Sequence, residues 1–126
     1  MPLVLAHRGA NKMAPQNTLP AFQKAVEFNA DGIETDVHLC KDGEIVICHN
    51  YTVDATSNGK GSIDEMTFAS LRELDFGSYF SNDFKGVKLP TLGELLALVK
   101  NMNLINIEIK PPQKDNDLVK RVVEEV

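Results

Sequence analysis

Ionisable side chains that could do chemistry recur where apolar, strand-like runs end. Side chains alternate faces along a strand, so Glu34 and Asp36 share one face of the run 33–39. The carboxyl ends of parallel strands form the active face of α/β folds, which would bring such groups together. Each group alone has a plainer interpretation, as a turn, a solvent-facing carboxylate, a core histidine or a surface ion pair. Their joint occurrence favours a site built from His7, Arg8, Glu34, Asp36, His49, Glu108 and Lys110.

Three of these residues, Glu34, Asp36 and Glu108, are carboxylates that would repel one another unless a cation lay among them. Ligands that are all oxygen favour Mg²⁺ or Ca²⁺ over zinc. Neither cysteine, Cys40 or Cys48, is placed to help bind a metal. The pattern therefore predicts a site for a hard divalent cation.

Two histidines facing such a metal, His7 and His49, can exchange protons near neutral pH. The cationic side chains Arg8 and Lys110 suit a phosphate group. A metal, an acid, a base and a phosphate clamp fit phosphodiester hydrolysis better than acyl transfer, for which no nucleophile elbow or Ser-His-Asp arrangement is visible.

The elements that must position these groups alternate between strand and helix. Strands are expected at 3–6, 33–39, 45–48 and 104–109, and helices from Thr18 to about residue 30, over 92–100, and from about 115 onward. Strands joined by crossover helices predict a parallel α/β sheet. The run 45–48 follows the second strand after a short turn, so that connection is irregular. Residues 50–88 break the alternation and are interpreted as an insertion over one end of the sheet.

The composition is that of one globular domain and excludes several classes of protein. The chain has 126 residues, 43% of them hydrophobic and 25% charged, with a formal net charge of -5. An acidic chain disfavours non-specific binding to nucleic acid or to an anionic membrane. No apolar run approaches the ~20 residues that span a bilayer. Two cysteines without metal or redox spacing favour a reducing, cytoplasmic setting.

Seven motifs in register resemble those of the glycerophosphodiester phosphodiesterases, over essentially the whole chain. They are His7-Arg8-Gly9-Ala10, Pro15-Gln16-Asn17-Thr18, Ile33-Glu34-Thr35-Asp36-Val37, Lys41-Asp42-Gly43, Val46-Ile47-Cys48-His49, Thr56-Ser57-Asn58-Gly59-Lys60-Gly61 and Ile107-Glu108-Ile109-Lys110. The family fold is a (β/α)8 barrel with a small insertion. The resemblance implies that residues 1–126 supply its N-terminal half: about the first four strands, with the insertion at about 50–88.

The resemblance also implies the chemistry. It places Mg²⁺ or Ca²⁺ on Glu34, Asp36 and Glu108, makes His7 and His49 the acid/base pair, and sets Arg8 and Lys110 against the phosphate. A glycerol hydroxyl would attack phosphorus, and water would open the resulting cyclic phosphate. The products would be glycerol 3-phosphate and an alcohol such as choline, and the partner is thus a small-molecule glycerophosphodiester.

Three positions depart from the family pattern. Gln16 stands where Glu is usual, Asn50 where Asp is usual and Ala55 where Arg is usual. Asn50 follows His49, so a less well-poised histidine and reduced activity are expected consequences. None of the three removes an expected metal ligand or acid/base residue.

Two other interpretations remain open. The first is a non-catalytic or incomplete barrel half that needs a partner chain or a C-terminal half, since a (β/α)8 barrel typically needs ~250 residues. The second is a related barrel phosphodiesterase that acts on phosphatidylinositol or sphingolipid. The Glu108-x-Lys110 pairing and the loop 56–61 are more similar to the glycerophosphodiester group.

Overall fold

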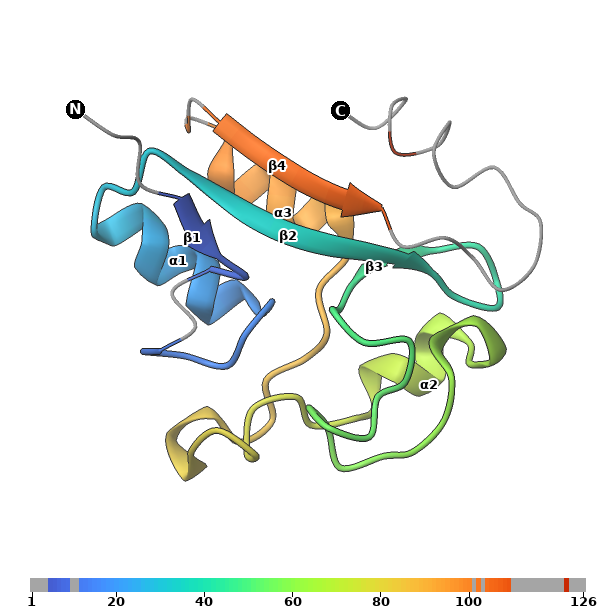
Figure 1. Cartoon of the computed structure of the whole chain (residues 1–126). Coiled ribbons are helices and arrows are strands. Elements are labelled where there is room, and N and C mark those ends of the chain that lie inside the picture. The colour runs from blue at the N-terminus through green and yellow to red at the C-terminus, as the bar shows by residue number, and fades with distance from the viewer. Residues whose placement is uncertain (1–4, 10–11, 101, 103, 110–121, 123–126) are drawn as a thin grey trace.

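Strand β2, Gly32–Leu39, lies at the centre of a four-stranded sheet in the computed structural model (Figure 1), which describes residues 5–9, 12–100, 102, 104–109 and 122. Strand β4, Leu104–Ile109, runs parallel to β2 along one edge over six residue pairs, from Gly32↔Leu104 to Val37↔Ile109. On the other edge, β1, Leu5–His7, runs parallel to the first residues of β2. Strand β3, Ile45–Ile47, takes the rest of that edge.

Strand β3 is antiparallel to β2, which is how the connection expected to be irregular departs from the parallel pattern of the other strands. A parallel neighbour needs a crossover of a dozen or more residues, whereas a short turn can only join antiparallel strands. The turn 41–44, with Gly43 at φ 90°, is such a connection. Consequently β3 carries the chain back from the end of β2 towards Asp36, whose carbonyl accepts a hydrogen bond from the Cys48 N–H.

Two helices cover one face of this sheet (Figure 1). Helix α1, Leu19–Glu27, begins at the N-cap Thr18 with Pro20 in its first turn, as predicted, and is followed by Asn29 in the left-handed region at φ 58°. Helix α3, Leu92–Val99, begins with the predicted capping box, in which Thr91 and Glu94 exchange hydrogen bonds. Their apolar faces, the sheet and Val122 near the C-terminus form the first cluster. Its buried residues are Phe22, Ala25, Ile33, Val37, Ile45, Ile47, Leu92, Leu95, Val99 and Val122.

Residues 50–88, called the 50–88 segment below, lie beyond the end of β3. They contain helix α2, Phe68–Arg72, and two 3-10 turns, Ile63–Glu65 and Asn82–Phe84. The segment and its neighbours form the second cluster: Cys40, Val46, Cys48, Val53, Ile63, Leu71, Phe76 and Leu89. Figure 1 shows the segment, in green to yellow, lying below the sheet, with α2 under the end at which β2 stops and the yellow part below α1.

Most predicted elements have their counterparts in the structure. The run 104–109 is β4 with the predicted bounds, and the helix predicted over 92–100 ends at Val99. The predicted start of the first strand at residue 3 and most of the helix predicted from about 115 lie outside the described residues. Among the described residues, no helix has the length and apolar character needed to span a membrane.

Candidate functional site

Three carboxylates, Glu34 and Asp36 on β2 and Glu108 on β4, converge on one side of the sheet. The parallel register sets Asp36 opposite Glu108, and Glu34 precedes Asp36 by two residues on the same face. One carboxylate oxygen from each lies within 4.8 Å of the others. The arrangement predicted from the strand pattern is therefore present as a cluster of carboxylate oxygens.

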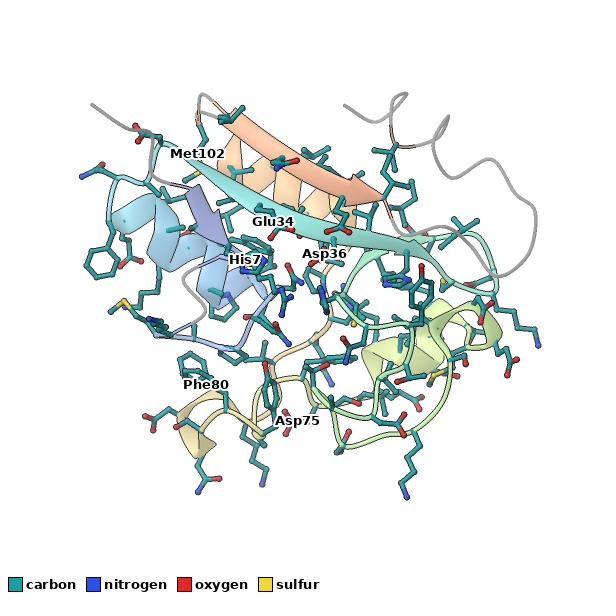
Figure 2. All side chains as sticks on the ribbon, in the orientation of Figure 1. His7, Glu34, Asp36, Asp75, Phe80 and Met102 are labelled. Carbon is teal, nitrogen blue, oxygen red and sulfur yellow. The ribbon has the colours of Figure 1, made fainter. Side chains whose placement is uncertain are left out.

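The electrostatics of this cluster favour a cation. The pKa of Glu34 is raised, first because the carboxyl is desolvated and then because Asp36 repels a second negative charge beside it. The positive charges of His7 and Arg8 lower the pKa of Glu34 in turn. His7 Nε2 lies 3.0 Å from Glu34 Oε2, while 60% of the histidine side chain remains exposed. In Figure 2, His7, Glu34 and Asp36 lie close together, and Met102 lies at the far end of the sheet.

Arg8 is held by its backbone as well as by its side chain. Its φ of 56° is in the left-handed region, uncommon for a residue with a side chain, and such backbone strain clusters at functional sites. Its N–H donates to the Glu34 carbonyl, and its own carbonyl accepts from the Asn17 N–H. The guanidinium Nη1 donates to Gln16 Oε1 at 2.6 Å, and Nε lies 3.9 Å from Asp36 Oδ2.

Asn17 is a buried residue of the site to which sequence reasoning gave no role. Its Nδ2 donates to Asp36 Oδ2 at 3.1 Å, and its Oδ1 accepts from the Thr35 hydroxyl at 3.0 Å. Its φ of 55° is left-handed, a region that asparagine tolerates better than most residues. It was visible in the sequence only as part of the motif 15–18, because nothing in its spacing indicates a contact with β2.

His49 follows β3 and returns to the same end of the sheet through the hairpin. Its Nδ1 lies 2.8 Å from Asn50 Oδ1, an oxygen that can only accept, so Nδ1 carries the proton and Nε2 is left as the basic nitrogen. His49 also lines a small cavity together with Gln16, Asn17 and Thr18 from the loop after β1. Asn50 thus orients His49 through an amide oxygen, although it departs from the family pattern.

The structure brings His7, Arg8, Glu34, Asp36 and Glu108 to one end of the sheet, with His49 against the adjoining loop. Lys110, the predicted second phosphate contact, lies outside the described residues. The site also uses Gln16, as the partner of Arg8, and Tyr79 of the 50–88 segment, whose hydroxyl accepts from the Gln16 N–H at 3.2 Å.

Comparison with solved structures identifies the wider architecture. A glycerophosphodiester phosphodiesterase from Agrobacterium tumefaciens superposes with a TM-score of 0.85 at 37% identity, over 89% of this chain and 48% of its own. A phosphodiesterase from Oleispira antarctica, in complex with the product sn-glycerol-3-phosphate, gives 0.84 at 33% identity, over 99% of this chain and 48% of its own. These proteins are (β/α)8 barrels, so the predicted fold class is confirmed, with this chain corresponding to about half of such a barrel.

Sequence comparison gives the same family. A glycerophosphodiester phosphodiesterase from Caldanaerobacter subterraneus is 44% identical over 97% of this chain and 53% of its own length. Human glycerophosphodiester phosphodiesterase 1 is 40% identical over 79% of this chain and 31% of its own. The chain thus spans about half the length or less of these relatives. Since the model of the glycerophosphoryl diester phosphodiesterase family matches residues 7–126, the chain belongs to that family, as its motifs predicted.

Proposed function

We propose that the protein hydrolyses glycerophosphodiesters to glycerol 3-phosphate and an alcohol, with the help of a divalent cation. The observation that carries the proposal is the cluster of Glu34, Asp36 and Glu108 oxygens within 4.8 Å, next to His7 and Arg8. The relative from Caldanaerobacter bears the name of this activity, and the Oleispira structure holds sn-glycerol-3-phosphate.

The three carboxylates fit a hard cation. Mg²⁺ and Ca²⁺ bind oxygens at about 2.0–2.6 Å, so two oxygens on one ion lie at most roughly 5 Å apart. The observed spread of 4.8 Å is within that limit. A cation there would also offset the repulsion of Asp36 that raises the pKa of Glu34. When bound, a divalent cation supplies positive charge for a phosphate oxygen and lowers the pKa of a hydroxyl group bound to it.

His7 and His49 move the protons in this proposal. One histidine takes the proton of the glycerol hydroxyl as its oxygen attacks phosphorus, and the other donates a proton to the departing alcohol. In the second stage the roles reverse, and water opens the cyclic phosphate. His49 is suited to either role because Asn50 fixes its Nδ1 and leaves Nε2 for the reaction. His7 holds its Nε2 against Glu34 at the exposed side of the site.

Arg8 and Lys110 bind the phosphate in this scheme. The Nε of Arg8 is buried and makes no hydrogen bond to any of the described residues. A buried donor without an acceptor costs free energy, and a phosphate oxygen would supply that acceptor.

The experiment is an assay of glycerol 3-phosphate release from glycerophosphocholine, with added Mg²⁺ or Ca²⁺ and with chelator. We expect release that chelator abolishes, and a fall of at least about 100-fold in His7→Ala, since acid/base catalysis commonly contributes 10²–10⁴-fold. Glu34→Gln should also lower the rate strongly, because it removes a proposed metal ligand. Glu27→Gln, at an exposed carboxylate of α1, is the matched control and should leave the rate unchanged. Release that persists with chelator would contradict the proposed need for a metal. Release that survives His7→Ala would contradict the acid/base role of His7.

A second candidate is a barrel half that binds its ligands but hydrolyses substrate only when further strands complete the barrel. Two observations favour it: among the described residues β4 pairs only with β2, and the chain spans about half of its relatives. Metal binding without turnover, in a chain whose mass in solution is that of a monomer, would support this candidate. Turnover by that monomer would overturn it.

A further inference from the structure

We propose that Gln16 and Asn17 act as a pair of neutral spacers that keep the loose ion pair of Arg8 and Asp36, 3.9 Å apart, from closing into direct hydrogen bonds. The two amides thereby keep the aspartate available to a cation and the arginine available to a phosphate. This inference rests on the proposed function for the roles of the two charged groups. Its own content is that the adjacent amides set the separation between them.

The geometry at one oxygen atom carries the inference. Asp36 Oδ2 accepts from Asn17 Nδ2 at 3.1 Å, while the Nε of Arg8 lies 3.9 Å from that same oxygen. Charge-assisted N–H···O bonds are usually about 2.7–2.9 Å long, so Arg8 stops short of a hydrogen bond. The asparagine amide, and not the guanidinium, makes the hydrogen bond to this oxygen.

Asn17 is fixed from three sides, which makes it a suitable spacer. The Thr35 hydroxyl donates to its Oδ1, and this contact determines which end of the amide faces Asp36. Its N–H donates to the Arg8 carbonyl, so the residue that separates the charges is bonded to the backbone of one of them. Asn17 and Asp36 are 4% and 1% exposed, so water does not compete for these bonds.

Gln16 holds the other charged group. Its Oε1 accepts from Arg8 Nη1 at 2.6 Å, a short hydrogen bond that holds one end of the guanidinium on a neutral partner. A glutamine leaves the positive charge of Arg8 intact, whereas a glutamate at this position would partly neutralise it. Tyr79 accepts from the Gln16 N–H, and this contact ties the spacer to the 50–88 segment.

Without the spacers, the guanidinium of Arg8 and the carboxylate of Asp36, 3.9 Å apart, would be close enough to form direct hydrogen bonds. A buried carboxylate beside a guanidinium gains strongly from a two-bond contact, and such a contact would occupy oxygens that a cation needs. Substitution of Asn17 is therefore expected to weaken metal binding through Arg8, and not only through loss of one bond to Asp36.

The experiment compares Mg²⁺ and Ca²⁺ binding by calorimetry in the purified chain, in Asn17→Gly, and in Asn29→Gly. Glycine tolerates the left-handed φ of both asparagines, so neither variant strains the backbone, and Asn29 is an exposed match far from the carboxylates. Loss of a residue that orients a metal ligand typically costs 10–100-fold in affinity. We expect a loss of about that size in Asn17→Gly and none in Asn29→Gly.

A rescue variant tests the spacer role itself. If Arg8 closes on Asp36 in Asn17→Gly, the double variant Arg8→Gln/Asn17→Gly should regain metal affinity to within a few-fold of the unsubstituted chain. Failure of this rescue, with Arg8→Gln alone binding normally, would overturn the spacer and leave Asn17 as an orienting residue only.

A measurement without metal separates this inference from the proposed function. In nitrogen-edited NMR of the metal-free chain, the Arg8 Nε–H signal should move downfield in Asn17→Gly, as a new bond to carboxylate forms, and stay in place in Asn29→Gly. An unmoved signal in Asn17→Gly would overturn the spacer even if the metal binds. Absence of metal binding to the unsubstituted chain would instead count against the proposed function, and the NMR result would still decide the spacer.

Discussion

The two hydrophobic clusters are built by different means. The first cluster joins regular elements, with α1 and α3 packed on the inner strands of the sheet. The second gathers around the 50–88 segment, where the only α-helix is the five-residue α2. In the first, backbone hydrogen bonds are made within strands and helices. In the second, the backbone bonds are those of turns and loops, and bonds from side chains supplement them.

Polar side chains that bond to nearby backbone hold the 50–88 segment in shape. The Ser78 hydroxyl donates to Asp75 Oδ2, and the N–H groups of Gly77 and Ser78 donate to Asp75 Oδ1. These bonds, that of the hydroxyl first, lower the pKa of Asp75. Ser57 and Ser81 make similar local bonds. A segment built this way depends on particular residues more than on periodicity, and we expect it to open more readily than the sheet and its helices.

The largest expected effect compares one leucine from each cluster. Leu95 of α3 and Leu71 of α2 are both fully buried, and truncation of either to alanine leaves a cavity. Leu95→Ala should lower the free energy of unfolding of the whole chain by roughly 2–5 kcal/mol, measured by urea denaturation. Leu71→Ala should have a smaller global effect, because the 50–88 segment can open without the sheet.

Thiol labelling separates local opening from global unfolding. Cys40 and Cys48 of the second cluster are free, and burial raises the pKa of each thiol to about 11, so labelling of the closed state is slow. Labelling should accelerate in Leu71→Ala under native conditions and change little in the exposed control Leu104→Ala. Equal acceleration in Leu71→Ala and Leu95→Ala would show that the two clusters open together.

A smaller effect compares the helix caps of the two regions. Thr91 begins α3 with a reciprocal capping box, whereas Thr67 caps the short, exposed α2 with one side-chain bond. Thr91→Ala should cost about 1 kcal/mol of global stability and Thr67→Ala a few tenths, both measured by thermal unfolding. Thr91→Ser, which retains the hydroxyl, is the control. If Thr67→Ala lost more stability than Thr91→Ala, α2 would be part of the structure that unfolds globally.

The pH dependence of the contact between the regions is expected to be smaller still. Arg72 of α2 binds Glu94 of α3, with Nη1 2.7 Å from Oε1, and these hydrogen bonds lower the pKa of Glu94. Because the folded pKa is depressed, the stabilisation is present above the ordinary glutamate pKa and is lost as pH falls through the folded value. Both side chains are about a third exposed, so solvent screening limits the effect to roughly 1 kcal/mol or less.

The measurement is acid-dependent labelling of Cys40 and Cys48, corrected for the intrinsic pH dependence of the thiol reaction with an unfolded reference peptide. Acidification through the lower range of carboxylate titration should increase opening of the 50–88 segment in the unsubstituted chain, and much less in Glu94→Gln. An identical increase in labelling in both proteins would show that protonation of Glu94 does not cause the opening.

The smallest effect is expected from Tyr79→Phe. The lost contact is an exposed hydrogen bond to the Gln16 N–H, which water can replace, so the free energy of unfolding should change by only a few tenths of a kcal/mol. Chemical denaturation measures it, and Tyr51→Phe, at another exposed tyrosine, is the control. A loss above about 1 kcal/mol would mean that Tyr79 holds the two regions together more firmly than its exposure indicates.

The sequence predicted the regular elements and the charged groups because both follow from local patterns. Alternation placed Glu34 and Asp36 on one face, the apolar run placed β4, and the capping box placed the start of α3. The metal, acid/base and phosphate roles of these residues remain predictions. The sequence marked the connection to β3 as irregular because of its short turn but did not give the strand's direction, which is antiparallel.

The supporting contacts were beyond sequence reasoning for a physical reason. The bonds from Asn17 to Asp36 and from Gln16 to Arg8 depend on the path of a loop between two elements, and that path has no periodicity. Two of its residues, Arg8 and Asn17, adopt left-handed φ values that nothing in their neighbours specifies. The contact of Tyr79 with Gln16 joins segments far apart in the chain, and a single sequence contains no signal for it.

The pairing of β2 with β4 has a consequence for the order in which the site assembles during synthesis. On the ribosome, β4 emerges well after β1, β2 and β3. Glu34 and Asp36 are therefore synthesised before Glu108, the third carboxylate of the cluster. The same strand that supplies Glu108 also pairs with six of the eight residues of β2, from Gly32 to Val37. We expect cation affinity and the protection of β2 amides from exchange to appear together in nascent chains of increasing length. Ligand binding would then report that the central strand has been completed.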